Sequence, residues 1–175
     1  MSEAHGGHAH VAEGDKFGAM VGVFVAIIGI FLAGVTIESH RAHTAAIVHK
    51  TEANDQWAFF QAKKIRGHVS DVGLTLVNSL SSDPAKVASV TEKLQVDAKR
   101  YNEDAETAKK GAEEKEHETE LAEHQALRFD LGEGLLELGL VLSSLYFLSK
   151  RKLFPTLGFS AALLGLLIGA SGFLV

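Results

Sequence analysis

The stretch FDLGEGLLELGLVLSSLYFLSKRK occupies Phe129–Lys152 and joins an apolar run to a basic end. The run is long enough to cross a bilayer as a helix, and a basic tripeptide is typical of the cytoplasmic end of a membrane span. Its first half nevertheless carries three carboxylates, Asp130, Glu133 and Glu137. A carboxylate at the centre of a span costs about 2.5–3.5 kcal/mol, so each of these needs a partner or water.

Two further apolar stretches lie on either side of this one. Phe17–Ile37 and Phe154–Val175 contain no charged residue, which a composition of 46% hydrophobic and 22% charged residues conceals. We expect three transmembrane helices, at residues 16–37, 129–149 and 154–175, with a basic loop at 150–153. The first is expected to be a retained helix, because its apolar run exceeds the roughly 7–15 residues of a signal peptide.

The region between the first and second spans, residues 38–128, is polar and rich in alanine, glutamate and lysine. It is interrupted by Ser81, Ser82, Asp83 and Pro84, where a capping aspartate precedes a proline suited to the first helical position. The pattern predicts an extramembrane antiparallel helical hairpin with its turn near 81–84. The fold class is therefore all-α, with a His-rich tail at residues 1–15.

The spacing of apolar and small residues predicts which faces of the two arms meet. In the first arm we expect a three-four seam at Ala42, Ala46, His49 and Ala53, then a phase shift to Ala58, Ala62, Ile65, Val69, Val72 and Leu76. In the second arm the seam comprises Val87, Val90, Leu94, Ala98, Tyr101, Ala105, Ala108, Ala112, Lys115, Thr119, Ala122 and Ala126. Alanine contacts bury little area, so we expect a thin coiled coil.

Lysine and arginine in short loops set the orientation of membrane proteins. Lys150, Arg151 and Lys152 form the cluster that decides it here. We expect a bacterial inner-membrane protein whose N-terminus and loop 150–153 are cytoplasmic and whose hairpin, residues 38–128, is periplasmic.

The three acids follow the second arm in phase, so we expect arm and span to form one helix with the acids facing another helix. We expect Glu137, the deepest, to be neutral and hydrogen-bonded across a helix contact, and Glu133 to lie nearer water. The alternative is that Asp130 lies in the headgroup region and that both glutamates are protonated and hydrogen-bond to Thr36 or to a neighbouring carbonyl. The other spans carry stripes of small residues, which mark close helix contacts. The stripes are Gly18, Gly22, Ala26, Gly29, Ala33 and Thr36, and Gly158, Ala162, Gly165, Gly169 and Gly172. The stripes either pack the three helices of one subunit or, because two stripes exceed the needs of one bundle, indicate a homo-oligomer, which we favour.

Histidines are the candidate metal ligands. With the turn near 81–84, His40, His43 and His124 fall at one height, where imidazoles would bind Zn²⁺ or Cu²⁺ or titrate at about pH 6.5. The alternative is that polar coiled-coil positions accept histidine without any ligand. The chain has no cysteine and so no thiolate site. We expect no resident cofactor, with Zn or Cu at these histidines as the alternative.

Trp57, Phe60 and Lys64 share one side of the first arm. They are interpreted either as a partner contact or as side chains that fill the phase shift in the seam. The blocks Asn54–Ile65 and Arg128–Glu133 resemble an uncharacterised bacterial domain-of-unknown-function family of the 4337 type. The resemblance implies a three-span membrane protein with an extramembrane helical hairpin, and it brings no activity, substrate or catalytic residue.

The sequence contains no glycine-rich phosphate loop, nucleophile elbow or zinc-protease motif, so we expect no enzyme. A net charge of −5 argues against nucleic acid as a partner. The expected partners are membrane lipid and further protein subunits. We expect an oligomeric membrane scaffold or an accessory subunit of a larger membrane assembly. The alternative is a cation channel or proton-coupled membrane component that uses a ring of intramembrane carboxylates.

Overall fold

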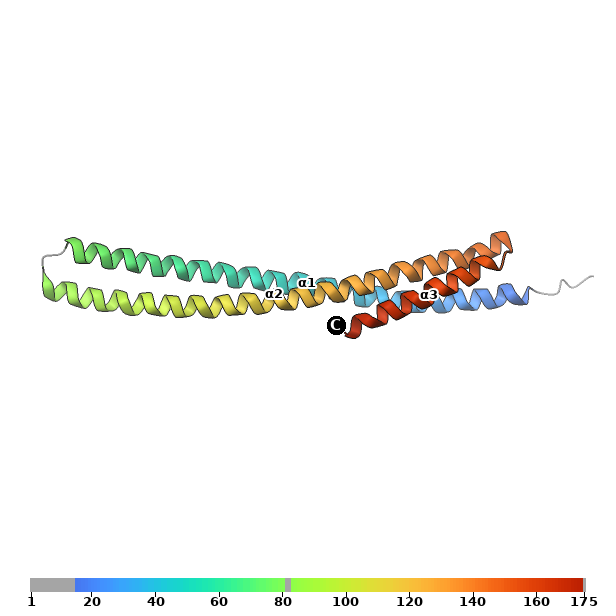
Figure 1. Cartoon of the computed structure of the whole chain (residues 1–175), viewed down its shortest axis with the longest axis horizontal. Coiled ribbons are helices and arrows are strands. Elements are labelled where there is room, and N and C mark those ends of the chain that lie inside the picture. Colours follow the sequence, from blue (N-terminus) through green and yellow to red (C-terminus); the bar gives the residue numbers. More distant parts are fainter. Residues whose placement is uncertain (1–14, 81–82, 175) are drawn as a thin grey trace, which may run out of the picture. The chain divides into compact units, whose positions relative to one another are not determined.

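The computed structural model describes residues 15–80 and 83–174, so the His-rich segment before residue 15 lies outside the described part. The elements are α1 (Lys16–Leu80), α2 (Pro84–Ser149), α3 (Leu153–Ser171) and the short 3₁₀ helix η1 (Gly172–Leu174) (Figure 1). These residues contain no strand. The prediction of an all-α fold is confirmed.

The chain divides into two compact units. The three-helix unit comprises Met1–Ile37 and Arg128–Ser171, and the hairpin unit comprises Glu38–Leu127 and Gly172–Val175. Three helical stretches, in α1, in α2 and at Leu153–Leu174, are long and apolar enough to cross a membrane, with mean hydropathies of 2.7, 1.5 and 2.0. Arm and apolar segment belong to one uninterrupted helix in both α1 and α2.

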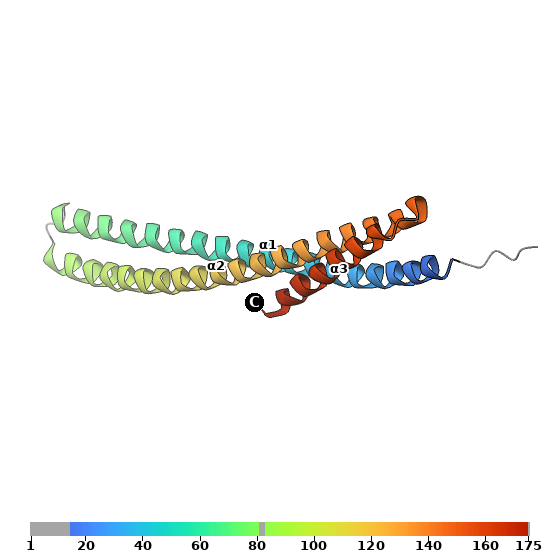
Figure 2. The same cartoon turned by 45° about the vertical axis from the view of Figure 1, so that its right-hand side comes forward.

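The hairpin unit consists of two antiparallel arms, which lie side by side in both views (Figures 1 and 2). At the start of α2 the Asp83 carboxylate accepts hydrogen bonds from the backbone N–H groups of Ala85 and Lys86, at 3.2 and 3.4 Å. Pro84 is the first helical residue. The sequence signal for a capped helix start after the turn is confirmed, because the carboxylate satisfies N–H groups that have no partner within the helix.

The predicted seam of the α2 arm is confirmed over most of its length. Its buried members are mostly alanines, and Val90 is exposed. The buried residues are Ala98, Ala105, Ala108, Ala112, Thr119, Ala122 and Ala126. Alanine has no side-chain rotamers to lose, so such a seam permits close approach of the arms at little entropic cost.

The seam of the α1 arm is confirmed in its first half, where Ala42, Ala46 and Ala53 are buried. The predicted phase shift after Ala53 is wrong, because the four-three spacing of the first half continues without interruption. The residues of α1 that are buried or half-buried beyond Ala53 include Trp57, Phe60, Lys63, Lys64, Gly67 and Ser70.

The more apolar face of this part of α1 consequently points away from α2. Ile65, Val69, Val72 and Leu76 are 62%, 66%, 59% and 52% exposed. Cross-arm polar contacts hold the observed rotation: Lys63 Nζ lies 2.6 Å from Asp104 Oδ2. An apolar stripe therefore remains uncovered within the chain.

The three-helix unit is built on an unusually close contact between α2 and α3. A Cβ atom on Gly139 would lie 2.7 Å from the carbonyl oxygen of Gly158, and one on Gly132 would lie 2.7 Å from the Cα of Gly169. Gly158, Ala162, Gly165 and Gly169 are buried, so these members of the small-residue stripe in α3 serve a contact within the chain. Ile28 of α1 and Leu136 of α2 complete the core beside Ala162.

The small-residue stripe of α1 is only partly used in this way. Gly18 is buried, whereas Ala26 and Ala33 are exposed. A Cβ atom on Gly29 would meet nothing within 4 Å. Part of this stripe is therefore available to a helix from outside the chain.

Candidate functional site

The structure places the three predicted acids of α2 differently from the sequence analysis. Asp130 and Glu137 are exposed, and Glu133 is half-buried. The carboxylate of Glu133 accepts a hydrogen bond of 2.7 Å from the Thr36 hydroxyl of α1. Within one chain the expected roles are thus reversed, because Glu133 makes the contact between helices and Glu137 faces outward.

The reason for this difference is a rotation of α2 by about one residue. The buried face of the helix comprises Phe129, Gly132, Leu136, Gly139, Ser143 and Tyr146. The expected face at Asp130, Glu133 and Glu137 lies one position further along the chain. The glycines of α2 determine the rotation, because only they allow the backbone of α3 to approach so closely.

The histidines proposed as metal ligands, His40, His43 and His124, are all exposed. In the part of the chain that the structure describes, they do not form a group of three ligand atoms within reach of one ion. Metal binding by these histidines stays a prediction. A different trio is brought together further along the hairpin: ligand atoms of His49, Glu52 and Glu118 lie within 4.8 Å of one another.

These three residues and Lys115 form a polar cluster that bridges the two arms. Lys115 Nζ lies 3.0 Å from Glu52 Oε2 and 2.7 Å from Glu118 Oε2. His49 Nδ1 lies 3.0 Å from Glu118 Oε2, an ion-pair distance without the direction of a hydrogen bond. The ammonium group of Lys115 thus supplies the cation that the two carboxylates require.

The sequence analysis included His49 and Lys115 in the seams but missed the two glutamates. The predicted turn near 81–84 also places His49 opposite His117, and His49 meets the adjacent Glu118 instead. A predicted pairing of the two arms shifted by one residue would have placed His49 opposite Glu118, the residue after His117.

Electrostatics within the polar cluster follow from these contacts. The hydrogen bond and charge of Lys115 hold the pKa of Glu52 below its ordinary value. Glu118 and then Glu52 raise the pKa of Lys115 above its ordinary value. Both groups are largely solvated, so their contribution to stability is modest. The cluster can align the two arms, and a divalent ion would have to displace Lys115.

We expect replacement of Lys115 by glutamine to lower the thermal midpoint of the full-length protein at pH 7, because Glu52 and Glu118 lose their shared cation. Because the pKa of Glu52 is lowered, its contact stabilises the protein above the ordinary pKa of glutamate, and this stability is lost as the pH falls. Because the pKa of Lys115 is raised, its contacts stabilise the protein below the ordinary pKa of lysine, and this stability is lost as the pH rises through the raised pKa. The deficit of the variant should therefore be largest between about pH 5 and pH 10 and should shrink toward pH 3.

The matched control for this variant is Lys109→Gln. Lys109 lies 3.7 Å from Glu113 of the same helix and bridges no arms. Circular dichroism melts in detergent at pH 3, 7 and 9 would measure both variants. Equal midpoint changes in the two variants, or a Lys115→Gln deficit that persists unchanged at pH 3, would show that the cluster does not align the arms. The imidazole of His49 also lies beside the Glu52 and Glu118 carboxylates. The Lys115→Gln and Lys109→Gln variants are therefore compared with each other at each pH.

Trp57, Phe60 and Lys64 face the second arm of their own hairpin. The indole N–H of Trp57 donates a hydrogen bond of 2.8 Å to the Glu116 carboxylate, and its ring meets Phe60 edge-on with ring centres 5.5 Å apart, a spacing typical of aromatic pairs. Lys64 Nζ lies 3.5 Å from Asn102 Oδ1. These side chains therefore fill the seam, which is the second of the two interpretations, although no phase shift occurs there.

Comparison with known proteins gives a family and no activity. The family described as Domain of unknown function (DUF4337) matches residues 17–175. No curated protein and no solved structure matches the chain significantly. The match covers all three apolar helical stretches and the whole hairpin, and it agrees with the resemblance carried by the Trp57 block and the acidic entry to the second apolar stretch. The chain therefore belongs to the DUF4337 family of proteins of unknown function.

Proposed function

We propose that this protein is a membrane-anchored homo-oligomeric scaffold, without enzymatic activity, whose hairpins associate through the apolar stripe of α1. The stripe consists of Ala58, Ala62, Ile65, Val69, Val72 and Leu76. The observation that carries the proposal is the exposure of this stripe, whose four large side chains are each more than half exposed. An accessory subunit of a larger membrane assembly would use the same surface for a different chain.

The spacing of the stripe supports association between helices. Its members follow each other at intervals of four and three residues, which is the a and d pattern of a coiled coil. Each fully buried valine, leucine or isoleucine side chain contributes about 1.5–3 kcal/mol. The four large side chains of the stripe therefore offer enough apolar area to favour association.

Charge supports a second copy of the chain as the partner. Arg66, His68, Gly73 and Thr75 flank the stripe, and Arg66 is the one permanent charge among them. A contact between identical stripes thus brings few like charges together. Leu76 at an a position and the β-branched Ile65 and Val72 at d positions favour three or four strands, whereas Val69 at an a position is also compatible with two. We propose three or four copies.

The position of Glu137 supports the same conclusion independently. Its carboxylate is exposed on an apolar helix, next to Leu138 and Val141, which are 49% and 55% exposed. If α2 spans the bilayer, a carboxylate facing lipid there is unfavourable by about 2.5–3.5 kcal/mol. A contact with another copy removes Glu137 from lipid. The uncovered part of the small-residue stripe at Ala26, Gly29 and Ala33 offers a surface for such a contact.

The test is the mass of the full-length protein in detergent, measured by light scattering coupled to size exclusion. We expect the wild-type protein to have the mass of three or four chains. Val69→Glu should reduce it to that of one chain, because every copy then places a carboxylate at one height in the seam. Unchanged helicity by circular dichroism would show that the variant still folds.

Val96→Glu is the matched control. Val96 is 62% exposed, like Val69 at 66%, but it lies on α2 outside the stripe. The control should keep the wild-type mass. A monomeric wild-type protein at micromolar concentration would overturn the homo-oligomer and leave the accessory-subunit form of the proposal. A Val69→Glu variant with unchanged mass would exclude the stripe as the interface.

A second candidate function, a cation channel or proton-coupled component, is favoured by the outward position of Glu137. In a symmetric oligomer the same carboxylate would repeat around the axis, and such rings attract cations. Glu133 is less suited to this role than the sequence suggested, because Thr36 already donates to it. The two functions differ in whether Glu137 faces a wet lumen or a dry helix contact.

The proposed location is the bacterial inner membrane, with the N-terminus and loop 150–153 in the cytoplasm and the hairpin in the periplasm. The ion pair between Asp15 and Lys150 supports placing the N-terminal end of α1 and this loop on one side, since their charged atoms lie 3.2 Å apart. The excess of lysine and arginine in the loop supports the cytoplasm as that side.

A further inference from the structure

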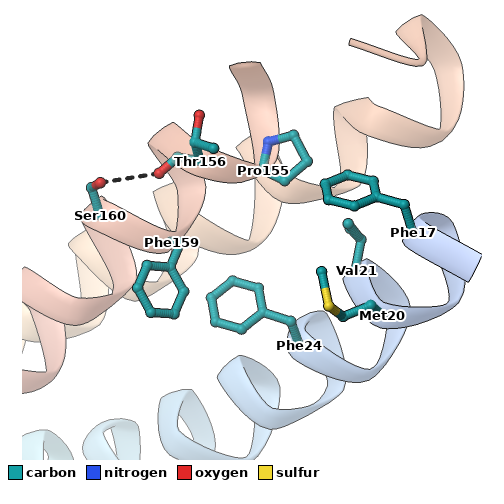
Figure 3. Close-up of a pocket in the computed structure, with 8 residues that line it drawn as sticks. All are labelled: Phe17, Met20, Val21, Phe24, Pro155, Thr156, Phe159 and Ser160. Carbon is teal, nitrogen blue, oxygen red and sulfur yellow. Dashed lines mark hydrogen bonds between the residues drawn. The ribbon is translucent and has the colours of Figure 1, made fainter. Parts of the chain in front are cut away.

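An apolar groove lies between α1 and α3 in the three-helix unit, at the end where α2 passes into α3. It encloses about 450 Å³ and is lined mainly by Phe17, Met20, Val21 and Phe24 of α1 and by Pro155 and Phe159 of α3 (Figure 3). The rings of Phe24 and Phe159 lie 5.0 Å apart within it. The volume falls in the range of small-molecule sites, about 300–1,000 Å³.

The polar atoms that line the groove are already satisfied. The Thr156 hydroxyl donates to the carbonyl oxygen of Leu153 at 2.7 Å. The Ser160 hydroxyl donates to the carbonyl oxygen of Thr156 at 3.0 Å (Figure 3). Because neither hydroxyl needs a partner from outside, the groove suits a hydrocarbon chain rather than a polar ligand.

One end of the groove is basic. Lys152 Nζ lies 5.1 Å from the centre of the Phe17 ring, which lines the groove. Asp15, the acid at this end, is engaged by the Gly18 N–H, the Tyr146 hydroxyl and Lys150. Within residues 15–80 and 83–174, no ion pair is found for Arg151 or Lys152. Among the residues that the structure describes, the cations at this end thus exceed the carboxylates, and their surplus charge is available to an anion.

We propose that this groove binds an anionic phospholipid, with an acyl chain against the phenylalanines and the phosphate at Lys152 and Arg151. Basic sites between membrane helices at the cytoplasmic side bind anionic headgroups, and the groove supplies the apolar half of such a ligand beside the basic half. A helix from a second copy fits the groove less well, because it would bring a second set of Lys150, Arg151 and Lys152 toward the first.

This inference rests on the membrane location in the proposed function, and it does not depend on the oligomer. The test is a titration of the full-length protein in detergent with dioleoylphosphatidylglycerol and with dioleoylphosphatidylcholine, followed by native mass spectrometry. The two probes have the same acyl chains and differ in headgroup charge. We expect tighter binding of the anionic lipid, and Lys152→Gln should weaken it about fivefold, as expected for one cation near a headgroup.

Two further variants on α3 test the apolar half of the site. Ser160→Trp fills the groove and should weaken binding of the anionic lipid, whereas Leu163→Trp, at an exposed position that does not line the groove, should leave it unchanged. Lys50→Gln, in the hairpin, is the control for loss of one charge. Competition by inorganic phosphate alone would show an anion site without an acyl chain and would overturn the proposal.

Equal affinity for the two lipids, or unchanged binding in both Lys152→Gln and Ser160→Trp, would also overturn it. Recovery of the protein in the soluble fraction without detergent would instead contradict the membrane location itself. The monomeric Val69→Glu variant should bind the anionic lipid as the wild type does. Loss of binding in that variant would contradict a groove built within one chain.

Discussion

Replacement of Gly139 by alanine is expected to destabilise the three-helix unit by about 1–3 kcal/mol, the usual cost of an added methyl group in a closely packed contact. The new Cβ would lie 2.7 Å from the carbonyl oxygen of Gly158 and 2.9 Å from the Cβ of Ala162. The obstacle includes backbone, so α3 would have to move as a whole. The midpoint temperature for loss of the monodisperse peak in size exclusion, measured in detergent, should fall.

Replacement of Gly134 by alanine should not destabilise the three-helix unit. Gly134 lies in the same helix, and a Cβ there would meet nothing within 4 Å. Alanine is favoured over glycine in a helix by up to about 1 kcal/mol, so Gly134→Ala should be neutral or stabilising. A fall of similar size in both variants would contradict the close contact between α2 and α3, because helix propensity alone cannot lower stability in either.

A single cysteine in the hairpin should react completely with an impermeant thiol reagent in whole bacterial cells whose outer membrane has been permeabilised. The natural chain has no cysteine, so each introduced thiol reports its own side of the membrane. Ala85→Cys, at an exposed position in the first turn of α2, should be labelled without lysis. Arg151→Cys, in the exposed loop before α3, should be labelled only after lysis.

The two positions should differ almost completely in labelling before lysis, because a charged reagent does not cross the inner membrane. The reverse pattern would invert the proposed orientation. Labelling of both positions without lysis would contradict an α2 that crosses the membrane between them. Retention of two basic residues in the loop keeps the orientation signal in the Arg151→Cys variant.

The sequence predicts the helical hairpin well because its signals there are local. Asp83 followed by Pro84 identifies the start of α2, and the alanine spacing from Ala98 to Ala126 identifies the face toward α1. These features depend on 3.6-residue periodicity and on capping, and each is contained in a few neighbouring residues.

The rotation of each helix is less predictable, because α1 has two faces that suit a seam. Apolar content favoured Ile65 and Val69, whereas the structure continues the earlier spacing through Gly67 and Ser70. Contacts between residues far apart in the sequence, above all Lys63 with Asp104, determine which face of α1 meets α2. Likewise, the burial of Gly132 and Gly139 instead of the acids beside them depends on α3, whose approach cannot be read from α2 alone.

The closest part of the contact between α2 and α3 is formed by glycine, alanine and serine, whose small side chains give it little shape by which one partner could be distinguished from another. Most helix interfaces recognise their partner through the shapes of large side chains, whereas glycine, alanine and serine present nearly the same surface in any helix that carries them. Specific pairing therefore depends on connectivity, because the short link between Ser149 and Leu153 keeps α3 close to α2. We infer that α3, detached from this link, would discriminate poorly among small-residue helices.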